Sequence, residues 1–118
     1  MPTSSTSAYR RGRTAERRAR LHYRLRGYRV LDTNAWSGRY ELDLVLRRGR
    51  RLVFCEVKAK GGPDYGDPLE MVGAEKVRRL TQAAEMWLGS HPEAAGLEIR
   101  FEAVGLQAGR LQRVVLVP

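Results

Sequence analysis

The chain has 118 residues, of which 42% are hydrophobic and 30% charged, and its formal net charge is +9. This length suits one domain with a single core, and the composition excludes an intrinsically disordered chain. The sequence holds no apolar run of the roughly 20 residues that a transmembrane helix needs, and its start lacks the apolar segment of a signal peptide. We therefore expect a cytoplasmic protein without membrane attachment, whose single domain spans residues 12–118 after a disordered tail over residues 1–11.

The first predicted helix is strongly basic. The segment 13–26 contains neither Pro nor Gly, and its apolar residues recur at helical spacing, which predicts a helix that ends at Gly27. Residues 10–29 hold nine arginines against one acidic residue, Glu16. Such a cluster is typical of a surface that binds the phosphate backbone of nucleic acids, although a solvated helix face is the alternative. The apolar residues that can share its buried side are Ala15, Ala19, Tyr23 and Leu25.

The rest of the chain alternates between strands and one further helix. We predict loops over residues 34–38 and 60–67, and a turn at Ala108-Gly109. The only cysteine, Cys55, excludes an internal disulfide and is expected in the core. Three consecutive strands precede a crossover helix, so the order predicts an α/β domain with a mixed sheet. The predicted strands are 28–32, 40–47, 52–59, 97–106 and 111–117, and the helix is 70–88.

Two acidic residues, Asp43 and Glu56, interrupt the second and third predicted strands. If Gly49 begins a two-residue type II′ turn, Arg48 pairs with Arg51 and Asp43 falls directly opposite Glu56. On the other face the apolar residues also match, although a shift of two residues would preserve that match. The expected apolar partners are Leu42, Leu44 and Leu46 with Val57, Cys55 and Val53.

Carboxylates placed opposite each other on paired strands repel, and a divalent cation would relieve that repulsion. Mg²⁺ prefers oxygen ligands and keeps several waters, so two carboxylates can hold it together with a substrate phosphate. Lys58 shares the face of Glu56 and could orient the attacking water or balance charge in the transition state. The alternative is a solvent-exposed Glu-x-Lys beside an unrelated acid.

The chain contains seven motifs in a fixed order: Gly12-x-x-x-Glu16-x-x-Ala19, Gly27-Tyr28-Arg29-Val30-Leu31, Glu41-Leu42-Asp43-Leu44, Val53-Phe54-Cys55-Glu56-Val57-Lys58, Tyr65-Gly66, Lys76 and Trp87-Leu88. Together they resemble the bacterial YraN family, a group similar to archaeal Holliday-junction resolvases and to the wider PD-(D/E)xK nucleases. The resemblance covers about residues 12–104 and implies a restriction-endonuclease-like core, a mixed β-sheet flanked by helices in the order αβββαββ.

The resemblance also implies roles for single residues. Asp43, Glu56 and Glu16 would be ligands of Mg²⁺ or Mn²⁺, and Lys58 would be the catalytic lysine. By spacing alone, Glu16 could instead pair with Arg20. The chain departs from the family pattern at two positions, with Tyr40 where Gly is usual and Lys60 where Arg is frequent, and the role of Glu41 stays open.

The function expected from this resemblance is metal-dependent cleavage of phosphodiester bonds in branched or structured DNA. Because two strands must be cut, a symmetric homodimer is expected. The alternative is a non-catalytic nucleic-acid-binding protein that kept the nuclease fold and works with a replication or repair partner. In either case the residues expected to contact phosphates are Arg10, Arg11, Arg13, Arg17, Arg20, Arg24, Lys60 and Lys76.

Overall fold

The computed structural model describes the backbone of residues 3–60 and 73–116, and the side chains of residues 12–59 and 73–116. The predicted loop over residues 60–67 and the predicted start of the second helix at residue 70 lie largely outside these ranges. No described helix is long and apolar enough to cross a membrane. The elements, in chain order, are α1 (Thr3–Arg24), β1 (Arg29–Ser37), β2 (Tyr40–Arg48), β3 (Arg51–Lys60), α2 (Ala74–Gly89), the short 3₁₀ helix η3 (Pro92–Ala94), β4 (Glu98–Gln107) and β5 (Arg110–Leu116).

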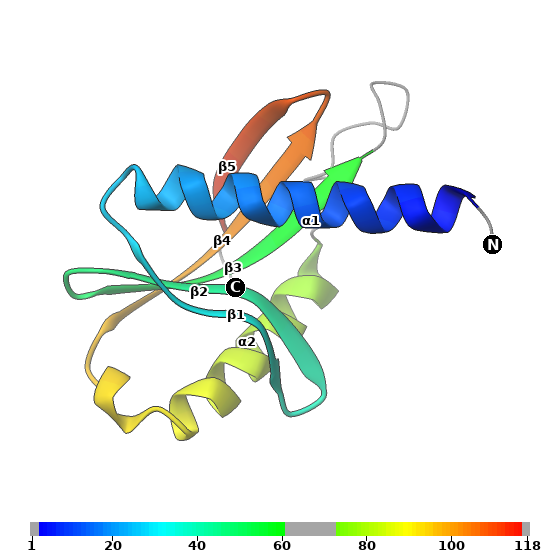
Figure 1. Ribbon diagram of the computed structural model, residues 1–118. Helices are drawn as coiled ribbons and strands as arrows, with labels where there is room; N and C mark the ends of the chain where they lie inside the picture. The colour runs from blue at the N-terminus through cyan, green and yellow to red at the C-terminus, as the bar shows by residue number, and fades with distance from the viewer. Residues whose placement is uncertain (1–2, 61–72, 117–118) are drawn as a thin grey trace.

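The five strands form one mixed sheet in the order β1-β2-β3-β4-β5. Neighbouring strands are antiparallel except β3 and β4, which are parallel and are connected through α2. Helix α1 crosses one face of the sheet and α2 lies against the other (Figure 1). The predicted α/β fold with a mixed sheet is therefore confirmed, and it is consistent with a restriction-endonuclease-like core.

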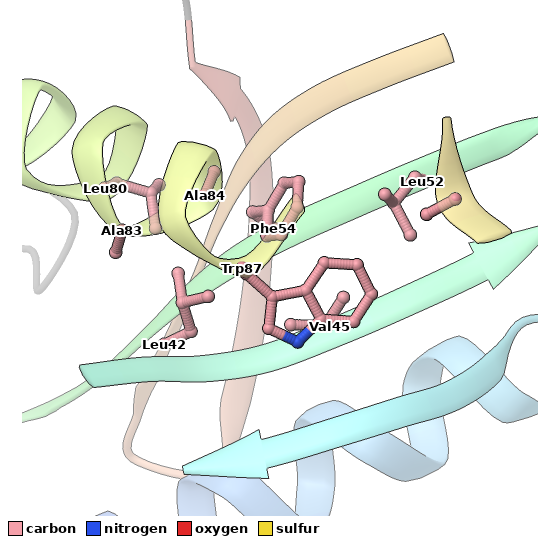
Figure 2. Packing of buried hydrophobic residues seen from close by; sticks show 9 residues of the cluster. Leu42, Val45, Leu52, Phe54, Leu80, Ala83, Ala84 and Trp87 are labelled. Atoms are coloured by element: carbon pink, nitrogen blue, oxygen red, sulfur yellow. The ribbon is translucent and has the colours of Figure 1, made fainter. Parts of the chain in front are cut away.

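Each helix covers its own apolar core, because alternate residues of β3 point to opposite faces of the sheet. Phe54 points toward α2, where its ring centroid lies 5.6 Å from that of Trp87 (Figure 2). Cys55, the next residue, lies in the α1 core, as predicted for a buried thiol. The α1 core comprises Ala19, Tyr23, Tyr28, Leu44, Leu46, Val53, Cys55 and Val104.

A buried carboxylate joins α1 to β4 and β5. Glu102 is completely buried and accepts hydrogen bonds from the Tyr23 hydroxyl at 2.6 Å and from Arg113 Nε at 2.7 Å. Arg100 lies 3.7 Å from the same carboxylate. Burial alone would raise the pKa of Glu102, but the bonds from Arg113 and Tyr23 outweigh it and hold this pKa below its ordinary value.

The start of α1 differs from the prediction. The helix begins at Thr3, whereas a disordered tail was expected over residues 1–11 and a helical start at Arg13. Residues 3–11 contain neither Pro nor Gly, so the backbone can continue the helix N-terminally, and the single Gly12 within it is tolerated. Leu25 lies beyond the last helical residue and is 75% exposed, so its predicted place on the buried side was wrong.

Gly27 ends α1, as predicted. The Gly27 amide donates to the Arg24 carbonyl and the Tyr28 amide donates to the Tyr23 carbonyl. These are the two hydrogen bonds of a Schellman motif, which requires a left-handed residue after the helix, and Gly27 has φ +87°. The rings of Tyr23 and Tyr28 pack edge to face at 5.2 Å and close the motif with an apolar contact.

We expect Gly27→Ala to lower the free energy of unfolding by roughly 1–2 kcal/mol, because an L-residue is strained at positive φ. An added Cβ would lie 3.5 Å from Arg48 Cδ, an ordinary contact, so the loss would come from backbone strain alone. Urea denaturation measures the change. Gly89→Ala is the matched control: it lies in α2 with no atom within 4 Å of the added Cβ, and we expect it to be neutral or stabilising.

The first hairpin is longer than predicted. Strand β1 continues to Ser37, which pairs with Tyr40, so the loop expected over residues 34–38 shrinks to the turn at Gly38 and Arg39. This segment pairs with β2, and Asn34 within it has φ +49°, a conformation that asparagine tolerates. A bulge between Val30 and Asp32 adds one residue to β1.

Candidate active site

The second hairpin has the predicted register, and its strands separate at the candidate site. Arg48 pairs with Arg51 across a turn in which Gly49 has φ +59°, and the pairing continues to Leu44 and Cys55, where it ends. One step further, Asp43 and Glu56 were expected directly opposite each other. They instead flank the point where β2 leaves β3.

The Asp43 carboxylate takes over a position in the hydrogen-bond ladder. In an antiparallel pair the bonded residues alternate, so a continued ladder would join the Val57 amide to the Leu42 carbonyl. The Val57 amide instead donates to Asp43 Oδ2 at 2.7 Å. Leu42 is consequently released from its predicted place opposite Val57, and its side chain lies in the α2 core (Figure 2).

Asp43 and Glu56 line one pocket of about 220 Å³ between the sheet and α2. Glu56 Oε1 lies 3.1 Å from Lys58 Nζ and 3.8 Å from Lys76 Nζ, so two ammonium groups share one carboxylate oxygen. Lys58 reaches it from the same strand face and Lys76 from the first turns of α2. The remaining lining residues are Tyr40, Glu41, Arg79 and Leu80.

Electrostatics in this pocket favour a neutral Asp43. Burial and the charge of Glu56 raise the pKa of Asp43 to about 7, the more distant charges of Glu16 and Glu41 add to this, and the bond from Val57 opposes it. Burial alone would lower the pKa of Lys58, but the Glu56 carboxylate outweighs it and raises that pKa.

Glu16 lies in a second cleft, beside the first pocket. Asn34 Nδ2, on β1, donates to Glu16 Oε2 at 3.1 Å. Among the described residues, Glu16 does not form the alternative ion pair with Arg20. The cleft has a volume of about 710 Å³, and Glu41 lines both it and the first pocket.

The structure therefore brings Asp43 and Glu56 together in the first pocket, whereas Glu16 lies in the neighbouring cleft. Within the described residues, no three His, Cys, Asp or Glu side chains converge closely enough to hold a metal ion as they stand. The link between the two pockets is Glu41, whose role the sequence left open.

Residues 15–106 match the family described as "Uncharacterised protein family UPF0102". The chain belongs to this family. A UPF0102 protein of Parvibaculum lavamentivorans is 43% identical over 103 residues, which cover 87% of this chain and 76% of that protein. A UPF0102 protein of Nitrobacter winogradskyi is 37% identical over 110 residues, covering 93% and 92%. The resemblance to the YraN family, which is UPF0102, is thereby confirmed.

Five of the eight predicted phosphate-binding residues of this UPF0102 chain have described side chains, and these lie in two places. Four arginines of α1 line the second cleft beside Glu16, whereas Lys76 lies in the first pocket. The side chains of Arg10, Arg11 and Lys60 lie outside the described residues. The four arginines of the cleft are Arg13, Arg17, Arg20 and Arg24.

Two residues beside the candidate active site were not predicted from the sequence. Asn34 was assigned to a loop, and its bond to Glu16 could not be inferred because it depends on how α1 lies over β1. Arg79 lines the first pocket, with its guanidinium 5.8 Å from the centre of the Tyr40 ring. Tyr40, the first residue of β2, lines the same pocket.

Proposed function

We propose that this chain is a Mg²⁺- or Mn²⁺-dependent endonuclease that hydrolyses phosphodiester bonds in branched or otherwise structured DNA. The observation that carries the proposal is the pair of carboxylates, Asp43 and Glu56, in one pocket with two lysines on Glu56. The chain belongs to UPF0102, and its motifs resemble those of Holliday-junction resolvases, which also supports the proposal. The names of the relatives assign no activity.

The donor set fits a hard divalent cation. Proteins bind Mg²⁺ with one or two carboxylates and let water and substrate phosphates complete the coordination, so Asp43 and Glu56 suffice as protein ligands. Their mutual repulsion, which contributes to the raised pKa of Asp43, is the kind that a dication relieves. When bound, the ion would supply Lewis acidity toward a phosphoryl oxygen and toward the attacking water.

The remaining residues of the site have separate tasks in this proposal. Lys58 places a positive charge at the carboxylate pair, where it can stabilise the extra negative charge of the transition state. Lys76 faces the same pocket from α2 and is suited to hold the scissile phosphate. The arginines of the second cleft bind the backbone without reading the sequence. A symmetric homodimer would allow both strands of a branched substrate to be cut.

A second candidate function is nucleic-acid binding without cleavage, together with a replication or repair partner. The observation in its favour is that Glu56 is already neutralised by Lys58 and Lys76, an arrangement that is stable without a metal ion. This second function gives no role to Asp43, which is partly buried and whose charged form is disfavoured.

A cleavage assay separates the two. Four-way junction, flap, single-stranded and duplex DNA would each be incubated with the protein in Mg²⁺, Mn²⁺ or EDTA. We expect metal-dependent cutting of branched DNA that falls on the order of 10³-fold in Asp43→Asn and Glu56→Gln, because each removes a metal ligand at nearly constant shape. Lys58→Met should lose on the order of 10²-fold while binding DNA normally.

The matched control is Glu85→Gln, which removes an exposed carboxylate of α2 that does not line the pocket. It should cut like the wild type. Tight, salt-sensitive binding with no cutting of any substrate under any metal condition would reject the nuclease and favour the binding protein.

A further inference from the structure

A second concentration of arginines surrounds the tip of the β2–β3 hairpin, away from the candidate active site. We call it the hairpin cluster. None of its residues lines the first pocket or the arginine cleft of α1. Its members are Arg29, Arg47, Arg48, Arg50 and Arg51.

The sheet places these arginines against one another. Arg29 is paired with Arg47 across β1 and β2, and Arg48 is paired with Arg51 across β2 and β3. Because successive residues of a strand point to opposite faces, the first pair lies on the α2 face of the sheet and the second on the α1 face. Like charges directly opposite on antiparallel strands destabilise the sheet. Each pair is unfavourable unless an anion offsets its charge, and Arg50 in the turn between β2 and β3 adds a fifth positive charge.

The protein itself supplies little negative charge there. Within the described residues, no carboxylate forms an ion pair with any member of the hairpin cluster. Glu98 is the strand neighbour of Arg51 and helps to raise its pKa, after the hydrogen bond to Tyr28. Glu102 also raises the pKa of Arg51, but its carboxylate is already bonded by Arg113 and Tyr23, so mainly Glu98 balances the five arginines.

The guanidinium groups are held in place by neutral acceptors. Arg47 Nε donates to the Gly49 carbonyl at 2.8 Å, and Arg50 Nη2 donates to the Gly96 carbonyl at 2.8 Å. Arg48 donates to the Arg26 carbonyl and stacks over the Tyr28 ring. Arg51 Nε is buried and has no hydrogen-bond partner in the described part of the chain. The cluster is thus ordered, cationic and incompletely satisfied.

The position of the cluster relates it to the active site. Arg47 is four residues from Asp43 along β2 and lies on the same face of the sheet as the pocket, which corresponds to about 14 Å in an extended strand. The hairpin tip lies beside the C-terminal end of α1 (Figure 1), and Arg48 bonds to Arg26 just beyond that end. The basic side of α1, which begins at the second cleft, therefore continues to the hairpin tip.

We propose that the hairpin cluster is a second binding site for nucleic-acid backbone, which holds the duplex arm about four base pairs from the phosphate in the active-site pocket. A rise of about 3.4 Å per base pair makes 14 Å equal to that distance. The inference rests on the proposed function for its orientation, but the binding itself needs no cleavage. Arginines on both faces of the hairpin tip suit neighbouring phosphates of a backbone that passes over the tip, and the contact of Arg48 with the end of α1 favours a backbone over an acidic protein segment.

Binding measurements in EDTA test the site independently of catalysis. The variant is Arg47→Gln/Arg50→Gln, because both side chains donate only to backbone carbonyls in the described structure. For a 30-base-pair duplex, we expect roughly tenfold weaker binding at low salt. We also expect the slope of log K against log salt to shrink by about 1.8, or 0.9 for each lost phosphate contact. Hydroxyl-radical footprinting on a four-way junction, whose branch point fixes the position of the protein, should lose protection on one arm only.

The matched control is Arg78→Gln/Arg110→Gln, which removes the same charge from exposed positions on α2 and β5. An unchanged salt slope in the hairpin variant, or an equal change in the control, would overturn the proposal. So would binding of polyglutamate that depends on Arg47 and Arg50 when duplex binding does not. Failure of the cleavage assay alone would overturn only the nuclease.

Discussion

Replacing Arg113 with Met is expected to lower the free energy of unfolding by roughly 3–5 kcal/mol, because it leaves a buried carboxylate without its main cation. Glu102 is fully buried, and Arg113 approaches it with two nitrogen atoms, at 2.7 and 3.1 Å. The Tyr23 hydroxyl and the more distant Arg100 stay in place, but neither replaces that bidentate contact. Urea denaturation monitored by the fluorescence of the buried Trp87 measures the loss.

Two further variants identify the cause. Arg110→Met, on the same strand but exposed, should change stability by less than about 0.5 kcal/mol. The double variant Arg113→Met/Glu102→Gln should recover a large part of the loss, because a neutral amide can keep the bond to Tyr23. If the double variant is as unstable as Arg113→Met alone, the defect lies in packing and the electrostatic explanation is wrong.

The pH dependence of this pair has a defined sign. In the wild type the pKa of Glu102 is lowered, so its contribution to stability is present above the unfolded value near 4.5 and is lost as the pH falls through the folded value. Without Arg113, burial dominates and raises that pKa. The deficit of Arg113→Met should therefore be larger at pH 7 than at pH 4.

Asp43→Asn is expected to stabilise the protein in EDTA by on the order of 2–4 kcal/mol at pH 8 while it abolishes the proposed cleavage. The pKa of Asp43 is raised from about 3.8 to about 7 in the folded protein. Between these values the folded state binds a proton that the unfolded chain has released, so stability falls as the pH rises from 4 to 7. Asparagine is neutral at every pH and can still accept the bond from Val57.

The gain from Asp43→Asn should accordingly be small at pH 4.5 and reach its full size above pH 7.5. Thermal unfolding at these two pH values measures the gain in stability. The control is Glu85→Gln at an exposed position, which should not be stabilised at either pH. Addition of Mg²⁺ should stabilise the wild type and leave Asp43→Asn unchanged, since only a bound ligand shifts the unfolding equilibrium. An equal gain at both pH values would exclude the charge of Asp43 as its cause.

Much of this architecture could be predicted from the sequence, because it depends on local patterns. Alternation in β2 and β3 and a glycine in the turn were enough to predict the pairing of Arg48 with Arg51, and with it the approach of Asp43 to Glu56. The end of α1 was predictable for the same reason, since Gly27 is suited to the left-handed position after a helix.

The features that the sequence did not predict depend on which of several possible contacts forms in the folded chain. Whether the Val57 amide bonds to a main-chain carbonyl or to Asp43 is decided by where β2 turns toward β1, and no sequence pattern records that choice. Leu42 changes its side of the sheet as a result. The pairing of Glu102 with Arg113 was equally hidden, because a charged residue in a strand usually marks a solvent-facing position.

The hydrogen bond from Val57 to Asp43 gives the protein an internal probe of its own ionisation. An amide proton held by a main-chain carbonyl is indifferent to the charge of nearby side chains at first order, but this one is held by the titrating group itself. The NMR chemical shift of the Val57 amide proton therefore follows the protonation of Asp43 directly. The same resonance distinguishes a proton from a metal ion as the occupant of that carboxylate, which connects the structure of the hairpin to the chemistry of the pocket in a single observable.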